Sequence, residues 1–447
     1  MNAGSLKFKY RYIFSHRGVK RYGVNTLWLF SEHILRMFST FLVGILIARY
    51  LGPEKFGIFN YVLAFVAIFQ VIAKLGLDEI VVRDLVKEPT KTEIYLGTSF
   101  WLKLSGGILT FIVILIISHF TADNFQTFLF INIIAAGIIF QSFEVIEFYY
   151  HATVQAKYIT LIRIIHSILS SIIKIALILF KAELIWFVLV TLFDTILLAM
   201  FSWLIYKSQK LPNFLRYFKL DLAKRLLTDS FPLLLGSIAV MIYMRIDQVM
   251  IKNMLGDRDL GLYSAAVKIV EVWYIIPMVI TRSLFPAIVN AKRMNEELYY
   301  KRLQQLLFFL IWLAIPLVLL LTILAKHIVL FLYGESFAEA SKILSISIWG
   351  LLFTFIGVGT SQWLIAENLQ NFSFYRTLYG AITNILLNFI LIPTFGIVGA
   401  SIAAVVSYSI AAYFSLFFNK KTLKIFKITS TAFFYPIIIL QRKIQNV

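Results

Sequence analysis

The chain has 447 residues, of which 60% are apolar, 16% aromatic and 15% charged, and it contains no cysteine. Soluble proteins average about 45–50% apolar and about 25% charged residues, so this composition excludes an ordinary soluble enzyme, a disordered protein and a disulfide scaffold. Basic residues number 42 and acidic residues 23, for a net charge of +19. The composition predicts an all-α polytopic membrane protein.

Continuous apolar runs that are long enough to cross a bilayer recur along the chain. A helix needs roughly 20 mainly apolar residues to cross about 30 Å of hydrocarbon. The runs are unbroken rather than alternating, which excludes a strand-based transmembrane barrel. About twelve transmembrane helices are predicted, near residues 25–49, 57–76, 96–117, 126–148, 158–180, 184–206, 230–252, 261–283, 304–325, 343–365, 375–393 and 397–418.

Lys and Arg residues are distributed unevenly between the connections on the two sides of the predicted membrane. With the N-terminus inside, the inner connections and termini hold 29 of them and the outer connections hold 5. Cytoplasmic connections carry this kind of excess. We therefore expect a multi-pass membrane protein with both termini in the cytoplasm. The positive charge needs no nucleic-acid partner to explain it.

A further apolar run, Thr431–Leu440, lies in the basic C-terminal tail. It has ten residues, contains Pro436 and is flanked by Lys427 and Arg442. This length is too short for a crossing, so the sequence predicts an interfacial segment, with a short thirteenth crossing as the alternative.

Two segments 204 residues apart have similar sequences. LGPEKFGIF at 51–59 follows the first predicted span, and LGDRDLGLY at 255–263 follows the seventh, with Leu and both glycines in matching places. Such turns let one helix stop and the next begin. The repeat predicts two pseudo-symmetric six-helix bundles around a central cavity. The predicted parts are a cytoplasmic basic N-terminus (1–22), a first lobe (23–206), a basic linker (207–229), a second lobe (230–418) and a basic tail (419–447).

The chain also resembles the Wzx-type oligosaccharide flippases of the polysaccharide transporter family, in the multidrug/oligosaccharidyl-lipid/polysaccharide (MOP) superfamily. Matching stretches are RYLGPEKFG at 49–57, RIDQVM at 245–250, LYGESF at 332–337, NILLNFILIP at 384–393 and GIVGA at 396–400. The resemblance implies alternating access for an undecaprenyl-diphosphate-linked oligosaccharide in cell-surface polysaccharide biosynthesis, such as that of O-antigen or capsule. It implies membrane lipids and other polysaccharide-assembly proteins as partners, and no cofactor.

Twelve charged side chains lie deep in the predicted spans, where each costs about 2.5–3.5 kcal/mol on insertion scales. Such residues generally face a bundle interior or an aqueous cavity. A diphosphate crossing the membrane needs positive partners, and Arg matches phosphate oxygens with a planar fork. The candidates for substrate binding are Arg36, Lys103, Arg163, Lys174, Arg245 and Lys268, and the candidates for gating or ion coupling are Glu32, Glu144, Glu147, Asp194, Asp247 and Glu271.

Because six acids accompany the six bases, a structural role for each pair stays open. Glu32 and Arg36 are four residues apart, and Lys268 and Glu271 are three apart, so each can form an ion pair on one helix. Arg36 is the residue for which a substrate or gating role is favoured over such a pair.

Spacing also indicates which other charged residues share a face. Arg163 and Lys174 are about three helical turns apart and share a face with Ser170, close to His166. This pattern suits the wall of a hydrated path.

The remaining pairs differ in the roles they predict. Arg245 and Asp247 are two residues apart and cannot face the same way, so Asp247 is expected to pair with a cation on another helix and to leave Arg245 free. Glu144 and Glu147 lie near the inner end of their span before aromatic residues, which favours a gate or an interfacial anchor.

Catalytic and metal motifs such as HExxH, a P-loop or GxSxG are missing from the sequence, so neither an enzyme nor a metal site is expected. One alternative is a MATE-like cation-coupled antiporter for small molecules. Such a protein is expected to have an acidic binding lobe rather than basic residues such as Arg36 and Arg163. A less favoured alternative is a membrane-embedded glycan polymerase or glycosyltransferase, which typically needs a sizeable extramembrane loop. No connection between the predicted spans exceeds about 23 residues.

Overall fold

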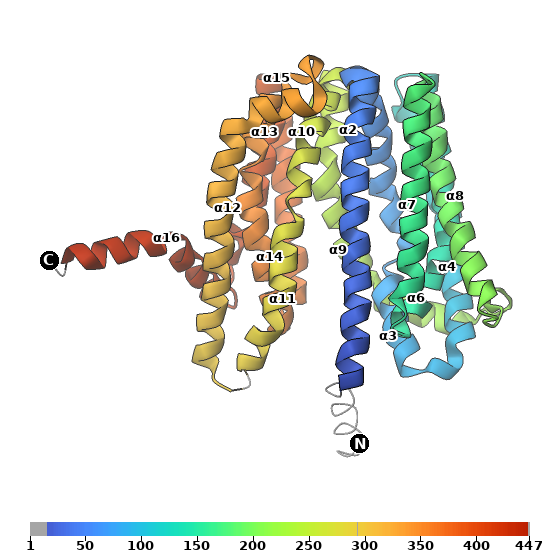
Figure 1. The fold of residues 1–447 in the computed structure, drawn as a ribbon, viewed down its shortest axis with the longest axis horizontal. Coiled ribbons are helices and arrows are strands. Elements are labelled where there is room, and N and C mark those ends of the chain that lie inside the picture. The colour runs from blue at the N-terminus through green and yellow to red at the C-terminus, as the bar shows by residue number, and fades with distance from the viewer. Residues whose placement is uncertain (1–15, 293, 446–447) are drawn as a thin grey trace. The chain divides into compact units, whose positions relative to one another are not determined.

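The computed structural model describes residues 16–292 and 294–445 of the chain (Figure 1). Every regular element within these residues is a helix, which confirms the all-α fold. Ten of the helical segments in the described part are long and apolar enough to cross a membrane. Most of the predicted basic N-terminus lies outside the described residues.

Two of these ten segments each contain two of the predicted spans. Helix α2 (His16–Lys74) has a non-helical backbone at Gly52, followed by Pro53. Helix α15 (Gln370–Ala412) has the same kind of interruption at Gly396. Glycine adopts the positive φ values of these breaks without a Cβ penalty. All twelve predicted spans overlap helical segments, and the count of twelve crossings stays a prediction.

Packing divides the described chain into two units. The first unit comprises the residues up to Ile47 together with Phe65–Ser237. A buried core cluster of this unit mixes aliphatic and aromatic side chains, and Phe100, Tyr206 and Phe214 pack edge to face within it. Besides parts of α2 and α9 (Leu220–Leu255), the unit contains α3 (Leu77–Lys87), η1 (Pro89–Lys91), α4 (Thr92–Thr121), α5 (Phe125–Phe140), η2 (Gln141–Glu144), α6 (Val145–Ala152), α7 (Ala156–Leu179), α8 (Leu184–Ser208) and η3 (Phe214–Arg216).

The second unit comprises Ala48–Ala64 and the chain from Ile238 onward. Helix α9 starts at Leu220, so the predicted linker 207–229 is helical in its last part. Besides the outer parts of α2 and α9 and all of α15, the unit contains α10 (Asp257–Val272), α11 (Ile275–Lys292), α12 (Glu296–Tyr333), η4 (Glu335–Phe337), α13 (Ala340–Ser347), α14 (Gly350–Ala366), η5 (Phe414–Leu416) and α16 (Leu423–Gln445).

The two repeated glycine turns have related backbone conformations. Gly52 has φ 71° and Gly256, which lies 204 residues later, has φ 105°. L-residues with a side chain rarely adopt these values. The sequence repeat therefore corresponds to a repeated turn between helices.

The same two turns pack against each other within the second unit. A Cβ atom on Gly57 would lie 1.8 Å from the carbonyl oxygen of Asp257, and one on Gly261 would lie 1.9 Å from that of Pro53. Gly57 and Gly261 are equivalent in the repeat, as are Pro53 and Asp257, so the contact is reciprocal. Such reciprocity is what a twofold relation produces. The contact explains why Ala48–Ala64 belongs to the second unit, whereas the predicted first lobe includes it.

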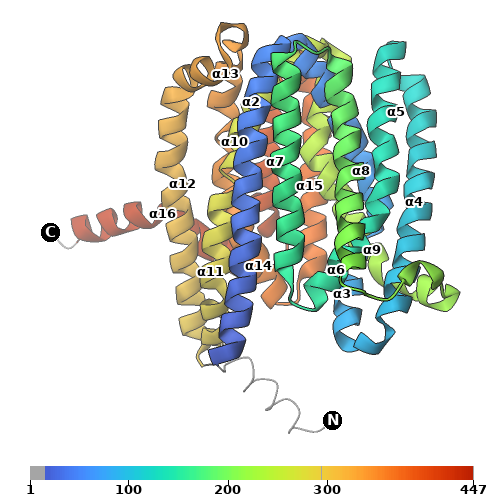
Figure 2. The ribbon, with the colours of Figure 1, turned by 45° about the vertical axis from the view of Figure 1, so that its right-hand side comes forward.

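Helix α16 contains the predicted interfacial run, Thr431–Leu440. The Trp312 Nε1 atom of α12 donates to the carbonyl oxygen of Ala432 at 3.2 Å, which attaches α16 to α12. Figures 1 and 2 show α16 directed away from the other helices of its unit. Side chains beyond Phe434 lie outside the described residues, and the interfacial placement of this run stays a prediction.

The charge asymmetry predicts a topology that cysteine labelling can test, because the natural chain has no cysteine. Glu54 and Arg216 are both exposed, in connections of opposite predicted side. An impermeant thiol reagent added to intact cells should label Glu54→Cys and should label Arg216→Cys only after the cells are opened. Labelling of Arg216→Cys in intact cells would contradict the predicted orientation.

Candidate functional site

A chain of alternating charges connects α2, α7 and α6 in the first unit. Arg36 Nε donates to Glu32 Oε1 at 2.7 Å, so the ion pair expected from the helical spacing is present. The other oxygen of Glu32 lies 3.9 Å from Arg163 Nη1. Arg163 in turn donates to both oxygens of Glu147, at 2.6 and 3.2 Å. Glu32 is only 3% exposed, so this carboxylate acts as a buried anchor between two guanidinium groups.

The exposed surface of α2 has a polar side and an apolar side. The Arg36 side chain is 47% exposed and shares its side of the helix with His33 and Thr40. At 100° per residue these three positions lie within about 60° of one another, and Arg36 is about 80–160° from the exposed apolar residues named below. Arg36 therefore lies on the polar side of a membrane-length helix rather than among the side chains suited to lipid. The exposed apolar residues on the opposite side are Leu35, Phe38, Leu42 and Leu46.

Lys103 on α4 is enclosed, in contrast to Arg36. Its side chain is 2% exposed, and Nζ donates to Glu144 Oε2 at 2.8 Å. Asp78 Oδ1 lies 3.8 Å away, and the Phe148 ring centroid 5.2 Å away. With acids and an aromatic ring around it, this ammonium group has no open face for a ligand in this conformation. The geometry favours a structural pair for Lys103 and Glu144.

A polar cluster joins α7 to α8, as the shared face predicted for α7 suggested. Lys174 Nζ donates to Asp194 Oδ2 at 2.7 Å and to Ser170 Oγ at 2.8 Å. Ser170 Oγ donates to the same Asp194 oxygen at 2.8 Å, and His166 Nε2 lies 3.6 Å from the other. Asp194 is thus the centre of the cluster. Across the described residues no three His, Asp or Glu side chains gather as metal ligands, so the ion-coupling candidates are individual acids.

The predicted arrangement of Arg245 and Asp247 is wrong. Arg245 is not free, because its Nη1 lies 3.2 Å from Glu271 Oε1 on α10. Among the described residues no cation pairs with Asp247, and its two oxygens accept hydrogen bonds from Tyr263 Oη at 2.8 Å and Asn388 Nδ2 at 2.9 Å. The two side chains do face different ways, but which neighbour carries the opposite charge depends on how the helices pack. Sequence spacing does not contain this information.

The pair of Lys268 and Glu271 stays a prediction, and each of the two residues also contacts another helix. The carboxylate of Glu271 is engaged by Arg245. Lys268 Nζ lies 4.5 Å from the centroid of the Phe56 ring, a cation–π distance. Lys268 thus contacts the repeated turn segment of the second unit.

Arg376, the second residue of the span predicted at 375–393, is a buried cation. It lies in α15, and its guanidinium donates to Thr360 Oγ1 at 3.1 Å, to the carbonyl oxygen of Gly357 at 3.3 Å and to Ser361 Oγ, all on α14. No carboxylate of the described chain pairs with it. The signal of its burial in the sequence is its place just inside a predicted span. Because that span is predicted to begin at residue 375, the prediction puts Arg376 at the edge of the membrane, next to the inner connection.

The buried pair of Lys103 and Glu144 predicts a large effect on stability. Glu144→Gln should lower the free energy of unfolding by about 3–5 kcal/mol, because a buried ammonium loses its charge partner. Adding Lys103→Met should restore much of the loss in thermal unfolding of the purified protein. Glu339→Gln, which breaks the exposed pair with Arg258, should change the unfolding temperature very little, because water and salt screen exposed charges. Equal losses from Glu144→Gln and Glu339→Gln would contradict the structural role.

Comparison with known proteins places these features in a family. The family model described as "Polysaccharide biosynthesis protein" matches residues 5–342. The model of the lipid II flippase MurJ matches residues 262–440. The capsular polysaccharide biosynthesis protein CapF of Staphylococcus aureus is 22% identical over 405 residues, which are 89% of this chain and 99% of CapF.

Solved structures of two transporters share the fold. An inward-facing multidrug resistance MATE transporter of the MOP superfamily gives a TM-score of 0.68 at 16% identity, covering 88% of this chain and 96% of that one. The lipid II flippase MurJ in its inward closed conformation gives a TM-score of 0.66 at 19% identity, covering 94% and 92%. Because the family model covers well over half of the sequence, the chain belongs to the polysaccharide biosynthesis protein family and has the fold of MOP superfamily transporters.

Proposed function

We propose that the chain is a flippase that moves undecaprenyl-diphosphate-linked oligosaccharide repeat units from the cytoplasmic to the outer leaflet of a bacterial inner membrane. The polysaccharide family match and the match of the second half to the MurJ flippase model support this proposal. These families consist of transporters rather than enzymes. The movement would occur by alternating access. The chain would work together with other polysaccharide-assembly proteins. Both of its termini would lie in the cytoplasm.

The exposed guanidinium of Arg36 is the observation that carries the proposal. A charged side chain within a membrane-length helix is costly unless it faces water or a polar partner. Glu32 holds Arg36 through Nε, the His33 Nδ1 atom lies 3.4 Å from Nη2, and the side chain stays 47% exposed on the polar side of α2. A fixed guanidinium on a hydrated surface can bind the oxygens of a phosphate group through charge-assisted hydrogen bonds. Arg36 is therefore the proposed first contact of the diphosphate.

Arg163 and Arg376 extend this proposal to other parts of the chain. Arg163 is 30% exposed, and Glu32 lies next to both Arg163 and Arg36. The positive charge of Arg163 would therefore also attract a phosphate bound by Arg36. In the second unit, Arg376 carries a positive charge that only neutral oxygens surround. Such a charge favours an anionic ligand over a cationic one.

Cation-coupled antiport is the second candidate function, and Asp247 is the observation that favours it. This carboxylate is buried and held by the neutral donors Tyr263 and Asn388. A buried acid without a paired base can take up a proton or a small cation. Asp247 would serve ion coupling in either function, beside the other candidates Asp194 and Glu271.

Reconstitution with a lipid-linked oligosaccharide tests the function and its driving force. We expect the purified chain to accelerate flipping in proteoliposomes and collapse of the membrane potential at constant pH and sodium to slow it. The electrical free energy of a diphosphate with about two negative charges falls by roughly 2 × 2.3 kcal/mol per 100 mV when it moves outward from an inside-negative compartment. Absence of flipping would contradict the proposed function. Flipping that ignores the potential but stops when the proton or sodium gradient collapses would favour ion coupling through Asp247, Asp194 or Glu271.

A further inference from the structure

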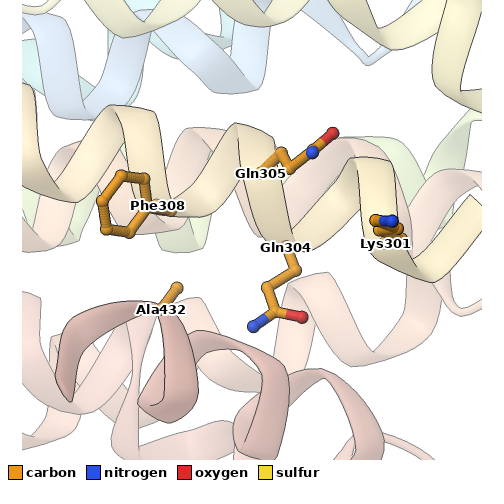
Figure 3. Close-up of a pocket in the computed structure, with 5 residues that line it drawn as sticks. All are labelled: Lys301, Gln304, Gln305, Phe308 and Ala432. Atoms are coloured by element: carbon orange, nitrogen blue, oxygen red, sulfur yellow. The ribbon is translucent and has the colours of Figure 1, made fainter. Parts of the chain in front are cut away.

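A pocket of about 330 Å³ lies between α12 and α16 in the second unit (Figure 3). Its lining residues are Lys301, Gln304, Gln305, Phe308 and Ala432. Figure 3 shows Gln304 and Phe308 on α12 and Ala432 on the facing helix. An ammonium group and two amides therefore line one part of the pocket, and an aromatic ring and a methyl group line the other. None of the charged candidates for substrate binding lines it.

The pocket lies where α12 changes from a polar to an apolar helix. Residues 296–305 read EELYYKRLQQ, whereas residues 306–325 contain no charged residue. In a membrane-spanning helix this change marks the boundary between the lipid headgroups and the hydrocarbon. The polar part of the pocket is therefore at headgroup depth, and the predicted topology puts it at the cytoplasmic leaflet.

Contacts on both sides of the pocket hold α16 against α12. On the polar side, Lys424 Nζ donates to Glu296 Oε1 at 3.2 Å and lies 3.4 Å from the centroid of the Tyr300 ring. On the apolar side, Trp312 Nε1 donates to the carbonyl oxygen of Ala432 at 3.2 Å. The pocket residues of α12 lie between these two attachments, so the docking of α16 forms the pocket.

The chain segments that form the pocket carry several exposed lysines, on α12 and in and just before α16. Lys301, Lys420, Lys421 and Lys427 are all exposed. None of these four lysines has a carboxylate partner among the residues that the structure describes, in contrast to Lys424. Basic residues close to the cytoplasmic surface of a membrane each attract anionic lipid with about 1 kcal/mol.

We propose that this pocket binds the headgroup of an anionic phospholipid of the cytoplasmic leaflet. The Lys301 ammonium pairs with the lipid phosphate, and the amides of Gln304 and Gln305 donate hydrogen bonds to phosphate or glycerol oxygens. Phe308, which is partly exposed, contacts the beginning of an acyl chain, and the fully buried Ala432 lies behind it in the wall. A zwitterionic lipid lacks the net charge that the lysines select, and free phosphate lacks the chain that the apolar part selects.

Lipid binding to the purified full-length chain tests the proposal directly. Native mass spectrometry and thermal unfolding are measured with phosphatidylglycerol, with phosphatidylcholine and with inorganic phosphate. We expect phosphatidylglycerol alone to stay bound and to raise the unfolding temperature. Equal effects of the two lipids, or an equal effect of inorganic phosphate, would overturn the proposal without any variant.

A variant then assigns the binding to this pocket. Lys301→Gln combined with Gln304→Leu should weaken the apparent affinity for phosphatidylglycerol by at least about fivefold. Lys326→Gln is the matched control, because it removes an exposed lysine from the other end of the same helix, α12, away from the pocket and its lysines. Equal losses in the variant and the control would show general surface attraction and overturn the assigned site. Displacement of phosphatidylglycerol by an undecaprenyl-diphosphate lipid, lost in the double variant, would assign the pocket to the transported lipid instead.

Discussion

Replacing Arg36 by alanine is expected to slow flipping by about 10- to 100-fold while the protein still folds and inserts. The estimate is the loss of hydrogen bonds to a charged group, worth about 1.5–3 kcal/mol. Glu32 would keep Arg163 as a partner, so the buried carboxylate would not be left without a cation. The measurement is the rate of flipping in proteoliposomes, together with export of finished polysaccharide in cells.

Two further variants separate charge from geometry at this position. Arg36→Lys should be partly active, because the charge remains but the planar fork that binds two oxygens is lost. Arg258→Ala removes an arginine whose ion pair with Glu339 is fully exposed, and it should flip at the normal rate. Normal flipping by Arg36→Ala would leave Arg36 as a structural partner of Glu32 and would contradict its assignment to the diphosphate.

The reciprocal glycine contact predicts the second large effect. Gly57→Ala would place a methyl group 1.8 Å from the carbonyl oxygen of Asp257, so the two turns would have to move apart. Overpacking of this kind costs about 1–3 kcal/mol, and here the obstructing atom belongs to the backbone. We expect a lower thermal unfolding temperature for Gly57→Ala and a similar loss for Gly261→Ala. The double variant should lose less than the sum, because one separation of the turns relieves both clashes.

Gly44→Ala is the matched control for this experiment. Gly44 lies in the same helix, α2, and a Cβ atom there would meet nothing within 4 Å. Alanine is better than glycine in a helix interior by about 0.5–1 kcal/mol, so this variant should keep or gain stability. A Gly57→Ala protein as stable as Gly44→Ala would show that the turns do not need the close approach.

The sequence alone predicted the membrane class and the all-α fold, because apolar runs of membrane length are a property of composition and order. The 204-residue repeat was also visible, because Gly52 and Gly256 take positive φ values for which glycine is suited. Helical spacing predicted the pair of Glu32 and Arg36 and the shared face of α7, because both follow from the 3.6-residue turn.

The partners of the other charged residues became known only from the tertiary structure. Asp247 accepts a hydrogen bond from Asn388, 141 residues away, and Arg245 pairs with Glu271 on the next helix. Arg376 is buried against α14 although its sequence position suggested the edge of the membrane. The reciprocal approach of the two glycine turns is likewise a contact between segments 204 residues apart.

The physical reason is the difference between local and long-range information. Periodicity, turn conformation and hydropathy act over one or two helical turns, so the sequence fixes which residues are apolar, which share a face and where a helix stops. An ion pair between helices needs side-chain atoms within 4.0 Å, and the packing of whole helices decides which atoms meet at that distance. The sequence therefore determined that charged residues lie within the membrane helices of this protein, and the tertiary structure decided which of them are enclosed, as Lys103 is, and which stay exposed, as Arg36 does.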